Sequence, residues 1–343
     1  MIRLAINGFG RIGRTAFKIA HDKYSKEIDV VAINDIADSK TLAHLLKYDS
    51  NYGVWDHEVS AGLDHIKIDN KVYKVLNEKD PLVLPWKNLA VDVVIESTGK
   101  FTDKTGASQH LQAGAKKVII SAPATRPSSG GKGDGSEIST YLLGVNGEKY
   151  GQEEIISNAS CTTNSVAPVA EVINQKFGIA KAMMTTIHAY TQDQNLQDGP
   201  HKDLRRARGA AQNIVPTSTG AAISTTEVIP ELKGKFDGVA IRVPVPVGSI
   251  SDFTFLLKKK VTVEEVNKAL KDASEEGHLK GILAVTDDPI VSSDIVGRSE
   301  SSIVDLGLTQ VVDGDMVKVF AWYDNEFGYS NRLIEQVINV GKS

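Results

Sequence analysis

Apolar runs alternate with helical patterns through the first half of the chain. Residues 2–8 (IRLAING) predict a strand, and residues 11–24 predict a helix whose Ile and Ala side chains share one face. Three further runs, at 28–35, 91–98 and 117–123, are rich in Val and Ile and do not alternate with polar residues. Such runs are typical of strands buried on both faces of a parallel sheet. The repeated strand–helix order therefore predicts a doubly wound α/β domain.

The second half contains longer extended segments, some of which alternate apolar with polar residues. They span 181–190, 237–259, 301–312 and 315–326. Residues 262–277 and 331–342 instead show helical spacing of their apolar side chains. This mixture predicts an α+β domain with a mixed or antiparallel sheet.

We place the domain boundary directly before the single cysteine, because 343 residues are too many for one average core. The prediction is a first domain over 1–160, completed by a C-terminal helix within 326–343, and a second domain over 161–325. Residues 124–139 (ATRPSSGGKGDGSEIS) contain almost no large apolar side chains. We expect them to form a surface loop or a flexible excursion.

Composition and charge exclude several classes of protein. The chain has 39 Lys and Arg against 43 Asp and Glu, a net charge of −4, so it lacks the basic excess of a dedicated nucleic-acid binder. It has no run of about 18 apolar residues, so we expect no membrane span, and its N-terminus lacks a signal-peptide pattern. One cysteine cannot form an intrachain disulfide, which fits a cytoplasmic setting. We predict no bound metal.

Three glycines follow the first strand and enter the first helix. Gly8, Gly10 and Gly13 form G-x-G-x-x-G, which permits a tight turn, close approach to a pyrophosphate and close helix–strand packing. Asp35 ends the next strand, about 20 residues on, where an acid binds ribose hydroxyls and repels a 2′-phosphate. The pair favours NAD over NADP. Turns at 96–99 and 121–123 also follow strands, either as ligand turns or as ordinary turns.

The only cysteine lies among small polar residues at the predicted start of a helix. Cys161 precedes apolar residues at helical spacing, and Gly178 is typical of a helix end. A helix N-terminus is expected to lower the pKa of a thiol. His188, at the end of a predicted strand, is the candidate proton acceptor. Pro168 conflicts with the helix and predicts a kink or a lost hydrogen bond.

Taken alone, a lone cysteine or histidine is more often structural. Next to a dinucleotide cradle, the polar setting of Cys161 instead indicates oxidation of an aldehyde through a thiohemiacetal and a thioester.

Arginine and threonine residues downstream predict anion binding. Arg205, Arg206 and Arg208 lie within four positions, and Thr219 follows with Gly220. The planar guanidinium suits phosphate. The alternative for Arg206 and Arg208 is pairing with acids at a subunit contact. Arg242 interrupts an apolar strand, where a charge is costly unless it is paired, so the phosphate interpretation is favoured there.

Six motifs occur in order through nearly the whole chain: INGFGRIGR, ASCTTN, HAYT, HKDLRRARGAA, PTSTGAA and WYDNEFGYSNR. Together they resemble the phosphorylating glyceraldehyde-3-phosphate dehydrogenase family. The resemblance implies a Rossmann NAD-binding domain, an α+β catalytic domain, and a homotetramer in which a loop around 191–208 lines subunit contacts. It also implies that NAD oxidises glyceraldehyde 3-phosphate and that inorganic phosphate captures the thioester, giving 1,3-bisphosphoglycerate, in glycolysis or gluconeogenesis.

Carried over position by position, the resemblance makes Cys161 the nucleophile and His188 its activating base. The implied substrate and phosphate residues are Ser160, Thr162, Thr191, Arg205, Thr219, Gly220 and Arg242. The implied cofactor residues are Gly8, Gly10, Arg11, Ile12, Gly13, Asp35, Lys79, Thr98, Gly99, Ser121, Asn325 and Tyr329. Asn325 would fix the nicotinamide carboxamide, and Lys79 stands where the family often has an arginine near the adenine.

Four other functions compete with this interpretation. Erythrose-4-phosphate dehydrogenase is the closest, but Thr219, Gly220 and the HKDLRRAR run favour the phosphorylating enzyme. The acyl-phosphate and semialdehyde reductases usually prefer NADP, which Asp35 opposes. A thiol hydrolase would use the cysteine without a cofactor. A binding or scaffold protein would not need the intact pair of Cys161 and His188.

Overall fold

The computed structural model describes residues 1–125 and 138–342, so most of the low-complexity segment 124–139 lies outside the described residues. The chain divides into two compact units. The first comprises Met1–Tyr141, Lys149–Ala159 and Ser330–Ser343, and the second comprises Leu142–Glu148 and Ser160–Tyr329. Each unit has its own sheet.

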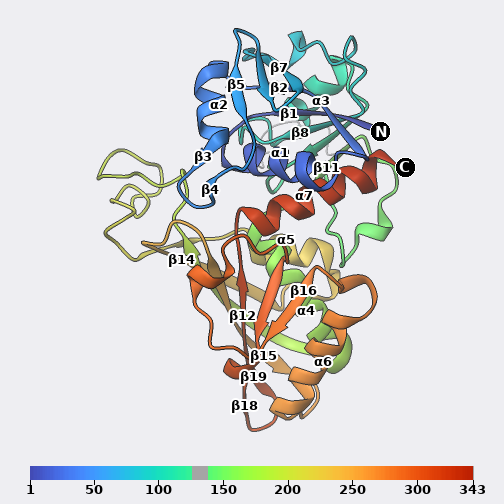
Figure 1. Cartoon of the computed structure of the whole chain (residues 1–343). Helices are drawn as coiled ribbons and strands as arrows, with labels where there is room; N and C mark the ends of the chain where they lie inside the picture. Colours follow the sequence, from blue (N-terminus) through green and yellow to red (C-terminus); the bar gives the residue numbers. More distant parts are fainter. Residues whose placement is uncertain (126–137, 343) are drawn as a thin grey trace. The chain divides into compact units, whose positions relative to one another are not determined.

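The first unit is built on a nine-stranded sheet with a parallel centre (Figure 1). In sheet order the strands are β10 (Ser139–Thr140), β11 (Ile155–Ser157), β9 (Lys117–Ile120), β8 (Val93–Glu96), β1 (Ile2–Asn7), β2 (Ile28–Asn34), β7 (Lys71–Leu76), β6 (His65–Ile68) and β5 (Val59–Ala61). The four strands predicted from apolar runs, β1, β2, β8 and β9, pair in parallel as neighbours. The doubly wound prediction is confirmed.

Four helices belong wholly or largely to this unit: α1 (Arg11–Lys23), α2 (Ser39–Lys47), α3 (Lys104–Gln112) and, from Ser330 onward, α7 (Phe327–Gly341). A short two-stranded sheet pairs β3 (Tyr48–Asp49) with β4 (Gly53–Val54). Leu4 and Ile6 of β1 are fully buried, and Phe9 meets Phe17 of α1 edge to face at 5.5 Å. Burial of this strand on both faces explains why its sequence does not alternate.

The sequence did not predict the antiparallel edge of the first sheet. Strand β6 pairs antiparallel with both β5 and β7, and β7 joins the parallel part beside β2. These strands alternate weakly and are short, which is why their pattern did not stand out. The edge brings the loop after β7 to the same end of the sheet as the glycine turn.

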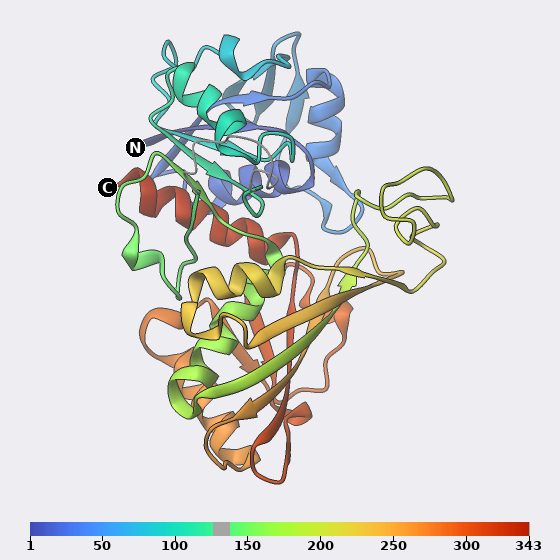
Figure 2. The same cartoon turned by 180° about the vertical axis from the view of Figure 1, so that it is seen from behind.

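The second unit contains an eight-stranded mixed sheet, as predicted (Figure 2). Its order is β13 (Val215–Ser218), β14 (Phe236–Val243), β12 (Ile179–Ala189), β15 (Ser249–Leu257), β19 (Met316–Tyr323), β17 (Ser302–Asp305) and β16 (Leu283–Thr286), with β18 (Gln310–Val312) beside β19. Helix α4 (Cys161–Phe177) packs against β12, β15 and β19 and also touches α5 (Ala221–Val228) and α6 (Val263–Glu275). The helices therefore cover one face.

The extended segment 237–259 is two strands rather than one. Strand β14 ends at Val243 and β15 begins at Ser249. Pro244 and Pro246 cannot donate to a ladder, and Gly248 has a φ of +93°, a conformation that favours glycine. The turn lets β15 return antiparallel to β12, while β14 lies parallel on the other side of β12.

Helix α4 runs uninterrupted through Pro168 to a C-cap at Gly178, whose φ is +71°. Proline has no N–H, so the helix forgoes the hydrogen bond to the carbonyl four residues earlier, as predicted. No helix among the described residues is both long enough and apolar enough to cross a membrane.

Candidate active site

The glycine turn after β1 is held by close backbone packing. Gly8 has a φ of +93°, and a Cβ placed on it would lie 2.7 Å from the Ser97 carbonyl carbon. A Cβ on Gly13 would lie 2.1 Å from the carbonyl oxygen of Gly8. Both positions therefore require glycine, for the turn and for the helix–strand approach. Gly10 differs, because a Cβ there would meet nothing within 4 Å.

Open space beside Gly10 lies at the start of α1. Gly10 is the N-cap residue of α1 and supplies no side-chain cap. The first N–H groups of the helix, from Arg11 and Ile12 onward, carry the positive partial charge of the helix N-terminus. The Arg11 side chain is directed elsewhere, to Asp49 Oδ2 at 2.8 Å. A backbone cradle without side chains in the way fits a pyrophosphate.

Asp35 ties the tip of β2 to the glycine turn. Its Oδ2 accepts the N–H of Phe9 at 2.6 Å, and its Oδ1 accepts the N–H of Ala37 at 3.0 Å. Each oxygen keeps a further lone pair for a ribose hydroxyl. The carboxylate is thus fixed in orientation beside the cradle, where a 2′-phosphate would meet its charge.

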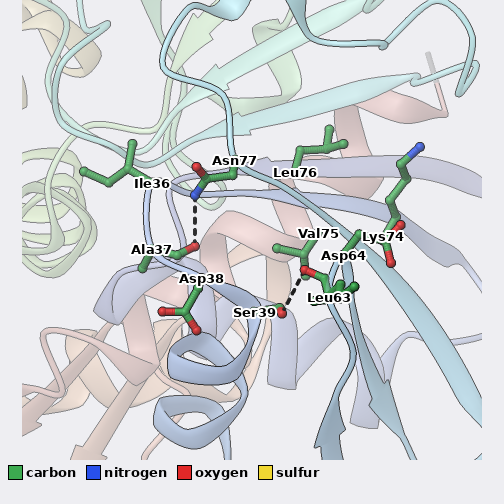
Figure 3. A pocket seen from close by; sticks show the side chains of 10 residues that line it. All are labelled: Ile36, Ala37, Asp38, Ser39, Leu63, Asp64, Lys74, Val75, Leu76 and Asn77. Atoms are coloured by element: carbon green, nitrogen blue, oxygen red, sulfur yellow. Dashed lines mark hydrogen bonds between the residues drawn. The ribbon is translucent and has the colours of Figure 1, made fainter.

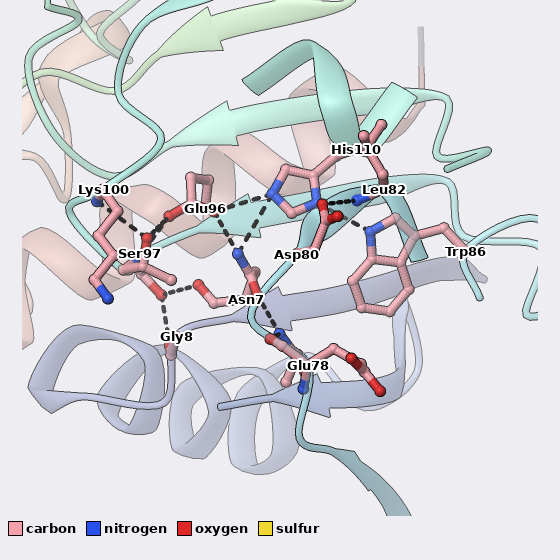
Figure 4. Close-up of polar contacts among 12 residues, drawn as sticks. Asn7, Gly8, Glu78, Asp80, Leu82, Trp86, Glu96, Ser97, Lys100 and His110 are labelled. Atoms are coloured by element: carbon pink, nitrogen blue, oxygen red, sulfur yellow. Dashed lines mark hydrogen bonds and ion pairs between the residues drawn. The ribbon is translucent and has the colours of Figure 1, made fainter. Parts of the chain in front are cut away.

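A buried polar network joins the strand ends under the cradle (Figure 4). Glu96, only 1 % exposed, accepts Asn7 Nδ2 at 2.6 Å and His110 Nε2 at 3.0 Å on Oε2. Its Oε1 accepts the N–H of Thr98 at 2.8 Å and also the Thr98 hydroxyl. Trp86 Nε1 donates to His110 Nδ1 at 3.0 Å, which assigns the His110 proton to Nε2.

This network fixes the Ser97–Gly99 turn. Ser97 Oγ donates to the carbonyl of Gly8 at 2.7 Å, and Gly99 has a φ of +71°. Thr98 and Gly99 therefore lie at the carboxyl end of β8, beside the cradle that follows β1. Ser121 follows β9, where its N–H bonds the carbonyl of Glu96 at 2.9 Å. These predicted positions lie at neighbouring strand ends, where doubly wound sheets bind ligands.

Three further predicted cofactor residues have other surroundings. Lys79 is exposed in the loop after β7. Asn325 and Tyr329 belong to the second unit and are buried. Asn325 Oδ1 accepts the Gly248 N–H at 3.1 Å and the Ser249 hydroxyl at 3.0 Å, so its amide nitrogen is the group able to donate to a ligand.

A hollow of about 730 Å³ opens near the start of α2 (Figure 3). Its lining includes Asp38, Asp64, Lys74 and Asn77. None of the predicted cofactor or catalytic residues lines it, but Ala37, whose N–H donates to Asp35 Oδ1, does, so the hollow adjoins Asp35.

Cys161 is the first residue of α4, and Ser160 caps that helix by accepting the N–H of Thr163 at 3.0 Å. Strand β12 follows α4 and returns past its N-terminus, as predicted. This brings His188 Nε2 to 3.5 Å from Cys161 Sγ. His188 Nδ1 bonds the carbonyl of Ala189 at 2.6 Å; because a carbonyl only accepts, Nδ1 carries the proton and Nε2 presents a lone pair to the sulfur.

The thiol is not acidified in the way that its helix position predicted. Although Cys161 is partly exposed as a residue, burial raises the pKa of its thiol, and the nearby charge of Arg242 and a hydrogen bond from Thr162 only partly offset this. Burial and Arg242 lower the pKa of His188 to about 3. The expectation of a lowered thiol pKa is therefore wrong, because desolvation of the thiol outweighs the charge of Arg242 and the hydrogen bonds that favour the thiolate. The directions of the two shifts favour a neutral thiol beside a neutral imidazole.

Arg242 lies opposite His188 in the parallel register of β12 and β14. Its Nη1 donates to Thr191 Oγ1 at 3.0 Å and to the Ala189 carbonyl at 3.2 Å. Among the described residues no carboxylate pairs with Arg242, and its buried Nε makes no hydrogen bond. A largely buried guanidinium with an unused donor fits an anionic ligand.

The structure brings Arg206, rather than the predicted Arg205, toward the loop of Thr219. Arg205 is exposed, whereas Arg206 donates from Nε to Thr217 Oγ1 at 3.0 Å and from Nη2 to the carbonyl of Ser218 at 3.1 Å. Its charge also acts on His188 and Arg242. Adjacent arginines in one run carry no sequence signal that tells which one faces the site.

Arg206 and Arg208 also pair with acids, as in the alternative interpretation, but a subunit contact at these pairs stays a prediction. Arg206 forms an ion pair with Asp193, and Arg208 Nε lies 2.7 Å from Asp198 Oδ2. Both pairs lie within one chain. Thr219 and Gly220 precede α5, and Thr219 Oγ1 accepts the N–H of Ala221 at 3.2 Å.

Comparison with known proteins gives consistent matches along the chain. Residues 2–104 match the family model "Glyceraldehyde 3-phosphate dehydrogenase, NAD binding domain", and residues 160–325 match "Glyceraldehyde 3-phosphate dehydrogenase, C-terminal domain". The chain is 57% identical to a glyceraldehyde-3-phosphate dehydrogenase of Mycobacterium avium, covering 100% of this chain and 99% of the relative. It is 53% identical to one of Streptomyces coelicolor, covering 99% and 98%.

Removing the charge of Glu96 tests the network beneath the cradle. In Glu96→Gln an amide N–H₂ faces either the Asn7 and His110 donors or those of Thr98, so buried donors oppose each other. We expect a loss of about 1–3 kcal/mol in the free energy of unfolding, measured by urea titration, and weaker NAD binding. Glu78→Gln is the control, because Glu78 is exposed and contributes only backbone groups to the network. Equal stability of both variants would contradict the role of Glu96.

Arg242→Gln tests the electrostatics of the thiol. Because the Arg242 charge acts to lower the pKa of Cys161, its removal raises that pKa further, and the curve of alkylation rate against pH moves to higher pH. The measurement is the iodoacetamide rate from pH 6 to 10. Arg205→Gln, which removes an exposed charge, leaves the curve in place. A curve that Arg242→Gln does not move would place its charge away from the sulfur.

Proposed function

The chain belongs to the glyceraldehyde-3-phosphate dehydrogenase family, and we propose from this premise how its own residues carry out the reaction. It is an NAD-dependent enzyme that oxidises an aldehyde. The observation that carries the proposal is the 3.5 Å contact between Cys161 Sγ and the unprotonated Nε2 of His188. A thiol and a base at this distance form the arrangement required for covalent catalysis.

The first unit supplies the residues for NAD. The N–H groups at the start of α1 receive the pyrophosphate, and Asp35 receives the ribose hydroxyls. Thr98, Gly99 and Ser121 line the neighbouring strand ends. Lys79 and Tyr329 remain proposals from the family resemblance, and Asn325 offers its amide nitrogen to the nicotinamide carboxamide. Bound NAD supplies the acceptor for the hydride of the substrate aldehyde.

Cys161 and His188 perform the covalent chemistry. As Sγ bonds to the aldehyde carbon, the thiol proton passes to His188 Nε2, and the aldehyde oxygen becomes an oxyanion. The Cys161 N–H at the start of α4 donates to that oxygen. The proton held on His188 completes the thiohemiacetal, and His188 takes it back when this intermediate is oxidised to the thioester. Both groups are neutral at rest, so charge forms only when the aldehyde is bound.

Two anion sites surround the sulfur in this proposal. Arg242 and Thr191, already hydrogen-bonded to each other, hold one phosphate, and the unused Arg242 Nε points to the same role. Thr219, Gly220 and Arg206 form the second. The hydroxyl of Ser160 is hydrogen-bonded to Thr163, and that of Thr162 to Tyr323. We therefore assign both residues to the surroundings of the thiol, and not to the main phosphate contacts. The acceptor of the acyl group is inorganic phosphate, which releases an acyl phosphate and restores the thiol.

The assembly proposed is a homotetramer. Leu196, Leu204 and Ile214 are 77 %, 81 % and 70 % exposed within one described stretch of loop. Exposed large apolar side chains gathered on one segment are typical of a surface that another subunit covers. The setting proposed is cytoplasmic, where the single cysteine stays reduced.

Phosphate dependence tests the reaction. With glyceraldehyde 3-phosphate and NAD but no phosphate, NADH absorbance at 340 nm should stop after one equivalent per chain, because the thioester persists. Phosphate should restore turnover. Arg206→Gln is expected to raise the KM for phosphate about 10–100-fold, because the variant loses a charged hydrogen bond to the phosphate. Arg205→Gln is the matched control. Cys161→Ser gives no burst, and undiminished turnover without phosphate would exclude phosphate as the acceptor.

Asp35→Asn tests cofactor choice. The amide keeps the shape of the carboxylate but loses the charge that repels a 2′-phosphate. We expect the ratio of kcat/KM for NAD to that for NADP to fall about tenfold or more. Asp38→Asn is the charge-matched control, because Asp38 lies three residues after Asp35, at the N-cap of α2. If the ratio stays unchanged in Asp35→Asn, Asp35 does not face the ribose.

A further inference from the structure

Two histidines and an aspartate converge on one side of the first unit, far from the thiol in the sequence. His21 and Asp22 lie in the last turn of α1, and His57 lies between β4 and β5. One donor atom from each residue lies within 4.8 Å of the other two. Asp22 Oδ1 is 3.0 Å from His21 Nδ1 and 3.2 Å from His57 Nε2.

The two distances from Asp22 Oδ1 are close to those between ligands of one metal ion. In a tetrahedral zinc site with bonds of about 2.0 Å, the ligand atoms lie roughly 3.3 Å apart. A hydrogen-bonded pair has similar distances, so the contacts of the remaining atoms of the three side chains decide between the two.

Outer partners orient two of the three ligands. His57 Nδ1 lies 2.7 Å from Asp69 Oδ2, and Asp69 Oδ1 accepts the N–H of Glu58 at 2.9 Å. Trp55 Nε1 donates to Asp22 Oδ2 at 3.0 Å, which leaves Oδ1 for the centre. A carboxylate behind a ligating imidazole is the usual support of a histidine that binds zinc.

The contacts of His57 are compatible with a bound cation. His57 faces a carboxylate with each ring nitrogen, and His21 Nδ1 faces the same Asp22 oxygen as His57 Nε2. A neutral imidazole offers one N–H and one lone pair. A dication bound by Asp22 Oδ1, His21 Nδ1 and His57 Nε2 would take a lone pair from each side chain, and Nδ1–H of His57 would donate to Asp69.

The surroundings are also suited to a cation. The C-terminal end of α1 carries negative partial charge. Lys18 Nζ lies over the Trp55 ring, 5.7 Å from its centroid. The side chains of His57 and Asp22 are 27 % and 38 % exposed, which gives an ion and a fourth, water ligand access.

We propose that His21, Asp22 and His57 form a binding site for a borderline transition-metal dication such as Zn²⁺, with Asp69 as the positioning residue of His57. The bound ion ties the end of α1 to the loop between β4 and β5. This site is independent of the proposed oxidation chemistry. The sequence analysis predicted no metal, because His57 is separated from the other two ligands by a helix and three strands.

The test uses the full chain carrying Cys161→Ser, because the thiol and His188 also attract zinc. Isothermal titration with Zn²⁺ should give one site per chain, and Co²⁺ should give the visible absorption of a tetrahedral N/O site. Asp69→Asn, which keeps the positive φ of +50° that asparagine tolerates, should weaken Zn²⁺ binding about 10–100-fold. His57→Gln should weaken it more.

The matched control is His65→Gln. His65 pairs with Asp64 at 3.1 Å on the same unit, and among the described residues no third ligand joins them, so the loss of His65 should leave Zn²⁺ affinity unchanged. Circular dichroism with EDTA checks that each variant folds, and His21→Gln replaces His57→Gln if the latter does not. If the titration shows no saturable site, the cluster is only hydrogen-bonded. If His57→Gln and His21→Gln bind as the parent does, the metal lies elsewhere. Either result overturns the proposal.

Discussion

One hydrogen bond at the end of β12 determines what the thiol can do. His188 Nδ1 donates to the carbonyl of Ala189, so the lone pair of Nε2 faces Cys161 Sγ. With the other tautomer, Nε2 would donate to the sulfur and no base would be present. The arrangement depends on strand register, because β12 places His188 opposite Arg242 of β14. A slip of one residue would turn His188 to the opposite face of the sheet and leave Cys161 without its partner.

The same burial that aligns these groups suppresses their charge. Packing raises the pKa of Cys161 and lowers that of His188, and Arg242 acts in opposite directions on their reactivity. Its charge favours a thiolate but disfavours an imidazolium. In an ion pair at rest, the charge of Arg242 would therefore stabilise the thiolate of Cys161 and destabilise the imidazolium of His188. In the proposed site, a phosphate held by Arg242 would compensate its charge and so remove the penalty on the imidazolium when His188 accepts the proton. Substrate binding and proton transfer would then be coupled through one guanidinium.

Local spacing was sufficient to predict much of this molecule. The glycine turn, Asp35 and the helix that begins at Cys161 depend on residues close in sequence or on a known strand–helix interval, and the structure has them at neighbouring strand ends or at a helix start. The thiol pKa was mispredicted because it depends on how deeply the fold buries the sulfur, which local spacing does not reveal. Arg206 could not be told from Arg205, since the loop alone decides which side chain turns inward. Glu96, His110 and Trp86 show no motif, because each belongs to a different element.

Burial and hydrogen-bond partners separate the two histidine–carboxylate clusters of the first unit. Around Glu96 the carboxylate accepts from Asn7, His110 and Thr98, and His110 Nδ1 accepts from Trp86, so protein partners engage both carboxylate oxygens and both ring nitrogens. Glu96 and His110 are also sealed from solvent. Around Asp22, ring nitrogens of His21 and His57 lie close to one carboxylate oxygen, with Asp69 behind His57, and the side chains of His57 and Asp22 are partly exposed. Convergence on one oxygen together with solvent access, rather than the residue types, distinguishes the second cluster as the one proposed to take up an ion.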